Sequence, residues 1–258
     1  MGDGPVQALL VAGGKWHDID FARAEVLKLL CEFPRVRTRV AEDYADLEAL
    51  EEADFLVTYT CDLRPSPAEE AALSDFVKRG GRWFALHGTN SIMEFLAEGV
   101  SIPRSHELLM ETLGSRFIAH PPIAPYTVEV VDPHHPLVQG VDPFQADDEL
   151  YLCEYTNELE PLLQTHYSGK AVGFVEDDWP GEEPRLVMYL NRVGAGEVLY
   201  LTLGHCRGRY DMRPVMDEYP KVERGAWELP VFYELLRRGL AWASGCERSD
   251  VSAAAGRV

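Results

Sequence analysis

Along the first ninety residues, short apolar runs typical of strands alternate with stretches whose apolar side chains have helical spacing. Gln7–Ala12 has the pattern of a buried strand, and from Ala22 to Phe33 apolar residues recur every three or four positions. The alternation predicts strands at Val36–Val40, Phe55–Thr60 and Arg82–His87, with helices at about 19–33 and at Tyr44–Glu52. Such a βαβ order predicts a mostly parallel central sheet with helices on both faces.

A capping box marks the start of the helix that precedes the last of these strands. Ser66-Pro67-Ala68-Glu69 combines a serine N-cap, a proline at the first helical position and a glutamate three residues after the cap. Leu73, Phe76 and Val77 share one face of the helix, and Gly80-Gly81 is expected to end it.

Beyond Gly88 the pattern is less regular and richer in strands. A helix is expected at His106–Leu113 and another from Pro230 to about Ala243. Strands are expected at Tyr126–Val131, Pro161–His166, Ala171–Glu176, Arg185–Asn191 and Glu197–Leu203, the last two joined by a glycine-bearing hairpin loop. We find no linker that divides the chain, so residues 1–245 are predicted to form one domain and residues 246–258 a flexible tail.

Composition narrows the classes of protein to consider. The 258 residues are 46% hydrophobic, which suffices for a buried core, and the formal net charge is −19. This charge repels phosphate backbones and anionic membranes, so neither nucleic acid nor a membrane is an expected partner. The apolar runs are also too short to span a bilayer. Five cysteines without a CxxC pair indicate reduced thiols and a cytoplasmic location.

Three histidines follow predicted strands, where ligands bind in open α/β sheets. His17, His87 and His205 each lie just beyond the carboxyl end of such a strand, so we expect them to meet at one edge of the sheet. A single histidine more often makes a structural hydrogen bond than binds a ligand, and no HExxH motif is present. The convergence of three is what favours a site, and neutral imidazoles with a carboxylate suit a divalent metal, zinc above all.

One stretch carries much of the excess negative charge. Phe117–Gly169 holds nine carboxylates and four histidines and no lysine or arginine. Such a segment attracts a cation or offers acceptors to a polyhydroxylated ligand, although it is equally typical of a solvated acidic surface. His120 and the cluster Asp147-Asp148-Glu149-Leu150-Tyr151 are its candidate functional residues.

Five segments resemble motifs of the ThuA-like (trehalose-utilisation) family, in the family's order and over most of the chain. They are Gly80–His87, Phe117–Pro121, His135–Gly140, Asp148–Tyr151 and Gly194–His205. The resemblance implies a flavodoxin-like fold of the class I glutamine amidotransferase-like superfamily. In amidotransferases a nucleophilic cysteine follows one central strand, and His87 stands at that turn here. An imidazole does not readily replace a thiolate, so we expect no glutaminase activity.

The resemblance also implies a role in carbohydrate metabolism, with a disaccharide or keto-sugar as ligand. His17, His87 and His205 are the expected metal ligands. His87, Glu149, His120 and Asn90 are the expected catalytic residues, acting by metal-assisted or histidine–carboxylate proton transfer, as in an isomerase, epimerase or hydrolase. Asn90 would help to hold an oxyanion. The residues expected to bind the sugar are Gly14, Trp16, Asp148 and Tyr151.

Two alternatives remain from the residues alone. The first is a non-catalytic sugar-binding or regulatory module on a degenerate amidotransferase scaffold, with no bound metal. The second is a cysteine hydrolase that uses Cys206 beside His205. A homo-oligomer is also possible, with the aromatic segment Tyr210–Tyr219 as a candidate interface.

Overall fold

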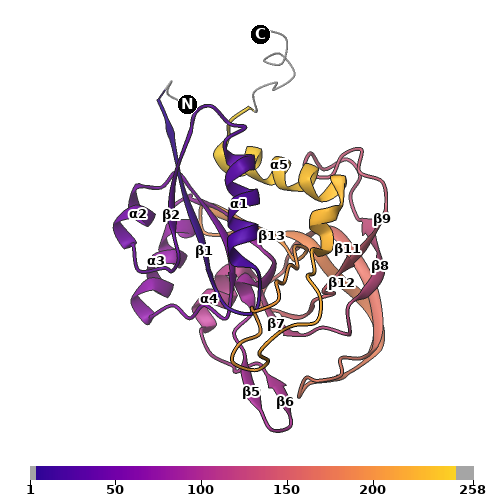
Figure 1. Cartoon of the computed structure of the whole chain (residues 1–258). Coiled ribbons are helices and arrows are strands. Elements are labelled where there is room, and N and C mark those ends of the chain that lie inside the picture. Colours follow the sequence, from indigo (N-terminus) through magenta and orange to yellow (C-terminus); the bar gives the residue numbers. More distant parts are fainter. Residues whose placement is uncertain (1–3, 248–258) are drawn as a thin grey trace, which may run out of the picture.

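A single large sheet organises the molecule, which is a computed structural model that describes residues 4–247 (Figure 1). Nine strands form it, in the spatial order β2 (Val36–Ala41), β1 (Val6–Gly14), β3 (Phe55–Cys61), β4 (Arg82–Leu86), β13 (Gly196–Leu201), β12 (Asp178–Val193), β11 (Glu160–Lys170), β8 (Ala124–Val130) and β9 (Phe144–Asp148). Of the predicted flexible tail, residues 248–258 lie outside the described residues.

The direction of the strands changes in the middle of this sheet. From β2 to β13 every neighbouring pair is parallel, whereas from β13 to β9 every pair is antiparallel. The α/β class is therefore confirmed, but the sheet is mixed and the expectation of a mostly parallel sheet is corrected. The cause lies in the connections, because the tight turn at Gly194-Ala195 reverses the chain between β12 and β13, whereas a parallel pair needs a long crossover.

Five α-helices pack around the described sheet: α1 (Ile19–Leu30), α2 (Leu47–Glu52), α3 (Pro67–Lys78), α4 (Glu107–Leu113) and α5 (Pro230–Ser244). Alternate residues of β1 divide between two hydrophobic clusters, as the period of a strand requires. Leu10 and Ala12 belong to a cluster with residues of α1 and α5, and Leu9 and Val11 to one with residues of α2, α3 and α4. Among residues 4–247, no helix has the length and apolar character needed to cross a bilayer.

Two local features of the helices bear on stability. The capping box predicted for α3 is confirmed, since the Ser66 side chain accepts from the Glu69 backbone N–H and the Glu69 carboxylate accepts from the Ser66 N–H. In α5, Gly239 faces the ring of Phe84 on β4. A Cβ at this glycine would lie 2.3 Å from Phe84 Cζ, so only glycine permits this close approach of helix and strand.

The main departures from the predicted elements lie in the second half of the chain. The predicted strand Ala171–Glu176 is instead a turn, closed by a hydrogen bond from the Ala171 N–H to the Asp177 carbonyl, and Val172 and Val175 on it are exposed. The pattern did not predict several short elements: β5 (Glu94–Leu96), β6 (Gly99–Ser101), β7 (Ser115–Ala119), β9, β10 (Leu152–Tyr155) and the 3-10 helices η1 (His87–Asn90) and η2 (Gly225–Glu228).

Candidate functional site: a buried histidine–carboxylate cluster

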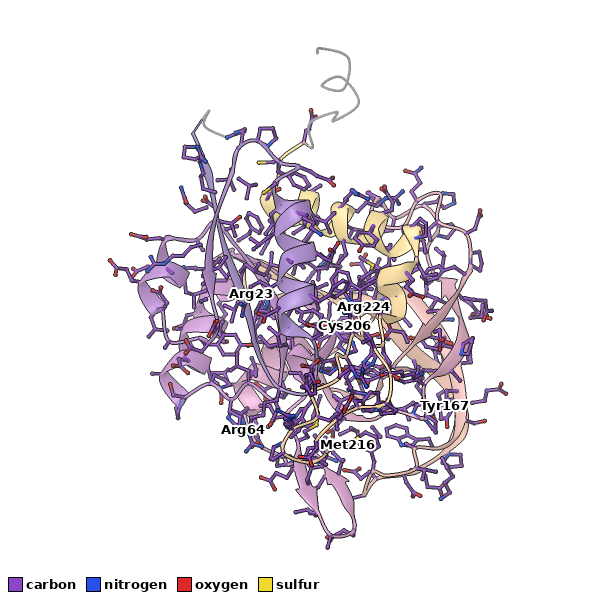
Figure 2. All side chains as sticks on the ribbon, in the orientation of Figure 1. Arg23, Arg64, Tyr167, Cys206, Met216 and Arg224 are labelled. Carbon is purple, nitrogen blue, oxygen red and sulfur yellow. The ribbon has the colours of Figure 1, made fainter. Side chains whose placement is uncertain are left out.

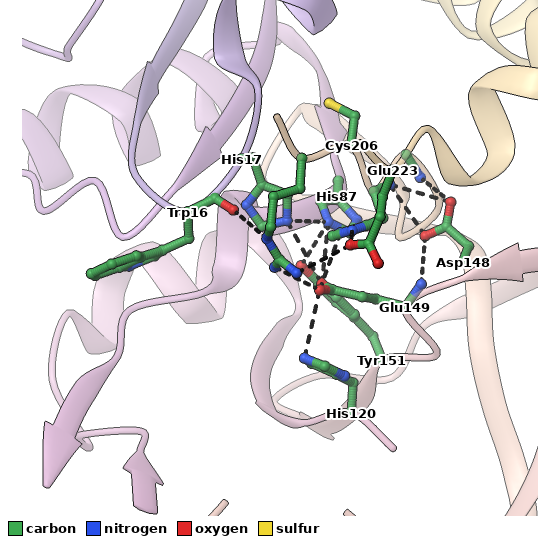
Figure 3. A network of polar contacts seen from close by, with 12 residues as sticks. Trp16, His17, His87, His120, Asp148, Glu149, Tyr151, Cys206 and Glu223 are labelled. Carbon is green, nitrogen blue, oxygen red and sulfur yellow. Dashed lines mark hydrogen bonds and ion pairs between the residues drawn. The ribbon is translucent and has the colours of Figure 1, made fainter. Parts of the chain in front are cut away.

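Four buried side chains meet beyond the carboxyl ends of the strands (Figure 3). His17 follows β1, His87 follows β4, His205 follows β13 and Glu149 follows β9. His87 Nε2 lies 2.8 Å from His17 Nε2 and 3.5 Å from Glu149 Oε2, and His205 Nδ1 lies 3.1 Å from Glu149 Oε1. Each residue offers one ligand atom, and these four atoms lie within 4.8 Å of one another. We call this group the histidine–glutamate cluster.

Hydrogen bonds outside the cluster fix the orientation of two imidazoles. His87 Nδ1 lies 2.8 Å from the Thr202 carbonyl, which only accepts, so Nδ1 carries the proton and Nε2 presents a lone pair to the cluster. His205 Nε2 donates to Glu223 Oε2 at 2.8 Å, which turns Nδ1 inward. Metal-binding histidines commonly have this pattern, with the outer N–H held by a carbonyl or a carboxylate.

The backbone is strained where strands lead into the cluster. Trp16, Asp62 and His87 are non-glycine residues with φ of 71°, 51° and 46°, in the left-handed region, at the ends of β1, β3 and β4. The Tyr200 hydroxyl donates to the His87 carbonyl at 2.6 Å and helps to hold this conformation. A Cβ at Gly88 would lie 2.6 Å from the Thr60 carbonyl oxygen. Strain of this kind concentrates at functional sites.

Burial and charge set the protonation of the cluster. Burial lowers the pKa of His17 to about 3, so this imidazole is neutral at pH 7. Burial alone would raise the pKa of Glu149, but the charges of His205 and His120 hold it well below its usual range. Burial likewise opposes the charging of His205, yet the carboxylates of Glu149 and Glu223 raise its pKa to about 9. The cluster therefore contains the ionised carboxylate of Glu149 and a protonated His205 imidazole, and a bound cation could replace the proton of His205.

Sequence reasoning missed two charged residues that complete the site. Arg207 Nη2 lies 3.2 Å from Glu149 Oε1, and its Nη1 lies 3.3 Å from Glu223 Oε2. Arg207 also donates to the Trp16 carbonyl at 3.1 Å and lies over the ring of Tyr219. One signal was available, because Arg207 is two residues beyond His205 and the acidic stretch contains no cation of its own.

A cavity of about 300 Å³ opens beside the cluster. Five of the predicted site residues line it, namely Trp16, His17, His120, Glu149 and Tyr151, together with Arg207. His120 Nε2 lies 3.6 Å from Glu149 Oε1, and the Tyr151 hydroxyl lies 3.3 Å from His87 Nε2. His87 and His205 are not among the residues that line the cavity, but both contact Glu149, which is.

Three other predicted residues contact protein groups and are not among those that line this cavity. The Asp148 carboxylate accepts from the backbone N–H groups of Gly204, His205, Ala226 and Glu149, at 2.7 to 3.2 Å. The Asn90 amide donates to Ser115 Oγ at 2.7 Å. Gly14 has φ of 105°, and a Cβ there would lie 2.0 Å from the Cys61 carbonyl oxygen.

Fold and site together define an α/β protein with a histidine–carboxylate centre at the carboxyl edge of its sheet. The chain belongs to the ThuA family, described as trehalose utilisation, whose profile matches residues 7–218. The resemblance found in the sequence is therefore confirmed, and membership supports a carbohydrate-related role. No curated protein gives a significant match.

Solved structures show the same fold. The chain is similar to a ThuA-like protein from Bacteroides uniformis at 18% identity and a TM-score of 0.65, covering 94% of this chain and 93% of that one. A ThuA-like protein from Parabacteroides merdae is 18% identical with a TM-score of 0.61, covering 93% and 90%. A β-galactosidase from Rahnella sp. R3 matches at 15% identity and a TM-score of 0.56, covering 95% of this chain but 32% of that one. At these identities the likeness concerns the fold alone.

Proposed function

We propose that this protein acts on a sugar that carries a carbonyl group and moves a proton at the carbon next to it, as an isomerase or epimerase does. The observation that carries the proposal is the meeting of His17, His87, His205 and Glu149 at the inner end of a cavity. The family description points to a sugar ligand. Its identity, the cytoplasmic location and a homo-oligomeric state stay predictions.

The donor set of the cluster fits a divalent metal, and zinc best. The imidazoles of His17, His87 and His205 are typical zinc ligands, and with them as ligands the Glu149 carboxylate beside them stays available as a base. His87 and His205 have the outer hydrogen-bond partners that such ligands need, whereas the outer nitrogen of His17, Nδ1, has none among the described residues. When bound, the metal would polarise the sugar carbonyl.

The remaining steps are assigned to side chains that line the cavity. Glu149, ionised and 3.6 Å from His120, would accept the proton from carbon and share it with this imidazole. The Tyr151 hydroxyl, whose pKa burial raises well above the usual value, stays protonated and would donate to the sugar oxygen. Arg207 would oppose the negative charge that develops there. The proton then returns to a neighbouring carbon or to the opposite face.

Asn90 and Asp148 have different places in this proposal from those that the sequence suggested. The amide of Asn90 donates to Ser115, so an oxyanion contact would need this side chain to turn. Asp148 is proposed to position His205 by holding its backbone N–H, without touching the sugar. Gly14 would act through the tight turn that leads from β1 to His17.

Elemental analysis of the purified chain tests the metal. We expect about one zinc per chain, lost in His17→Ala and His205→Ala because each removes a ligand. His166→Ala is the matched control, since this half-exposed histidine pairs with Glu129 on the antiparallel part of the sheet. Turnover of a keto-sugar by a metal-free protein would instead favour proton transfer by histidine and carboxylate alone.

One observation favours the non-catalytic sugar-binding module as a second candidate. The ion pair of Arg207 with Glu149 already balances the buried carboxylate, so the cluster does not require a cation for charge. This candidate predicts sugar binding without metal and without turnover. Binding of a keto-sugar by the unmodified chain without any turnover would favour this candidate, whereas in an enzyme the unmodified chain turns the sugar over and Glu149→Gln abolishes this turnover.

A further inference from the structure

The cavity beside the histidine–glutamate cluster has two chemically different ends. The inner end carries Glu149, Arg207, His120 and the Tyr151 hydroxyl. The outer half, as we use the term, is lined by apolar side chains: Trp16, Phe95, Val100, Val172, Phe174 and Met212. We propose that the outer half takes a flat apolar group, so that the ligand is a sugar with an aromatic substituent in place of a second sugar. This inference rests on the proposed function.

The backbone around the outer half of the cavity has few N–H and C=O groups that are free to bind a ligand. The Val100 N–H donates to the Gly173 carbonyl at 2.8 Å, and the Val100 carbonyl accepts from the Val175 N–H at 2.9 Å. The Phe174 N–H donates to the Ala171 carbonyl at 3.2 Å. A second pyranose would bring several hydroxyl groups against this wall, and each would lose water without gaining a partner. An aromatic ring has no such cost.

The aromatic rings that line the outer half of the cavity are oriented so that a further ring can pack against them. Trp16 and Phe95 have centroids 4.7 Å apart at a tilt of 55°, and Phe174 meets His120 edge to face at 4.9 Å. Such tilted and edge-on contacts are the preferred geometry between aromatic groups. Figure 3 shows the Trp16 ring directed away from the histidines. Trp16 Nε1 is buried without a hydrogen-bond partner among the described residues.

Exposed apolar residues gather around the same opening. Phe95 on the β5–β6 hairpin is 42% exposed, and Val172 on the turn before β12 is 72% exposed. The segment after β13, which contributes Met212 and Tyr219 to the cavity lining, also carries the exposed residues Tyr210, Val215 and Met216. In Figure 2, Met216 lies at the lower end of the molecule, above the β5–β6 hairpin. An apolar rim around a cavity is typical of a binding site for an apolar group.

Equilibrium binding of three glycoside probes, with free phenol as a fourth ligand, tests the inference. The probes are methyl β-glucoside, phenyl β-glucoside and trehalose, each also as a mono-keto derivative, measured by isothermal titration calorimetry with the full chain. We expect the phenyl glucoside to bind about tenfold more tightly than the methyl glucoside, because it buries an additional apolar ring, and more tightly than trehalose.

Substitutions of residues that line the outer half test whether this part of the cavity causes the preference for the phenyl glucoside. Val172→Asp and Phe95→Ser should remove the preference for the phenyl glucoside and leave the affinity for the methyl glucoside unchanged. Leu96→Ser is the matched control, because Leu96 is the next residue on the same hairpin, is 45% exposed and is not among the residues that line the cavity. This variant should keep the preference.

The possible outcomes separate this inference from the proposed function. If trehalose binds more tightly than the phenyl glucoside, the outer half takes a second sugar, and the inference fails while the sugar function stands. If phenol binds as tightly as its glucoside and the methyl glucoside does not bind, the apolar site stands and the sugar function fails. If no probe binds, both fail.

Discussion

The side chain of His205 has its chemistry set by its neighbours. Glu223 accepts from Nε2, and the Asp148 carboxylate accepts from the His205 backbone N–H, so both the ring and the backbone are held. Burial would raise the pKa of Glu223, but His205, Lys221 and Arg207 lower it to about 2. A carboxylate that stays ionised at any ordinary pH keeps the His205 ring oriented toward Glu149.

Replacement of Glu223 should therefore weaken metal binding without removing a ligand. Glu223→Gln keeps an acceptor for His205 Nε2 but loses the charge, so we expect about a 10- to 100-fold lower zinc affinity. Competition with a chromogenic chelator measures this. Glu218→Gln, an exposed carboxylate on the same loop that pairs with Arg209, is the control. Equal zinc affinity in both variants would contradict the role of the Glu223 charge in positioning His205.

The amino-acid sequence was sufficient to predict the three histidines of the site, because each of them directly follows the end of a strand. His17, His87 and His205 each follow a strand that apolar patterning reveals, and parallel strands end at one edge. Arg207 and Glu223 lie on the long irregular segment between β13 and η2, whose path follows from tertiary contacts such as the pairing of Arg207 with Glu223. No local pattern specifies that path.

Among the secondary-structure elements, local signals predicted the first half of the fold better than the second. From β1 to β4, capping side chains begin the three helices and glycine lies at the ends of β1 and α3, and the observed elements lie close to the predicted ones. Its apolar and β-branched residues predict a strand for the turn at residues 171–177, yet Val172 and Val175 are exposed. The physical reason is that this part of the chain borders a cavity, where apolar side chains need not enter the core.

The contact of α5 with β4 yields a prediction for Gly239. Alanine is favoured over glycine in a helix by about 1 kcal/mol. Here the added Cβ would meet the fully buried Phe84 ring, so Gly239→Ala should instead lower the free energy of unfolding by about 1–3 kcal/mol. Urea unfolding measures this. Glu234→Ala on the same helix should change stability by less than about 0.5 kcal/mol, and a more stable Gly239→Ala protein would contradict the packing.

For the whole molecule, stability should depend on pH through groups buried in their neutral form. Burial raises the pKa of Cys153 to about 12 and that of Tyr189 well above its usual value. Cys153 Sγ lies 3.8 Å from the Asn90 amide nitrogen, and Tyr189 contacts Ser115. The folded chain therefore holds these protons at pH values where the unfolded chain releases them.

The sign of the effect follows from this difference. The stability contributed by Cys153 is fully present below about pH 9 and is lost as the pH rises toward about 12, because the unfolded thiol ionises first. We expect the free energy of unfolding to fall between about pH 9 and pH 11. Urea unfolding across this range measures it. Cys153→Ala should show a shallower decline, and a decline as steep as in the unmodified chain would contradict the role of this thiol.

The pairing of β4 with β13 also decides when the site can exist. Leu86 pairs with Leu201, so the two strands that place His87 and His205 are neighbours in the sheet. They are nevertheless far apart in the chain. The ribosome releases β4 long before β13, and until β13 inserts beside β4 the nascent chain has neither His205 nor the Thr202 carbonyl that orients His87. A metal bound at this centre, as proposed above, would therefore be acquired only after translation of most of the sheet, and an unfinished polypeptide would not hold it there.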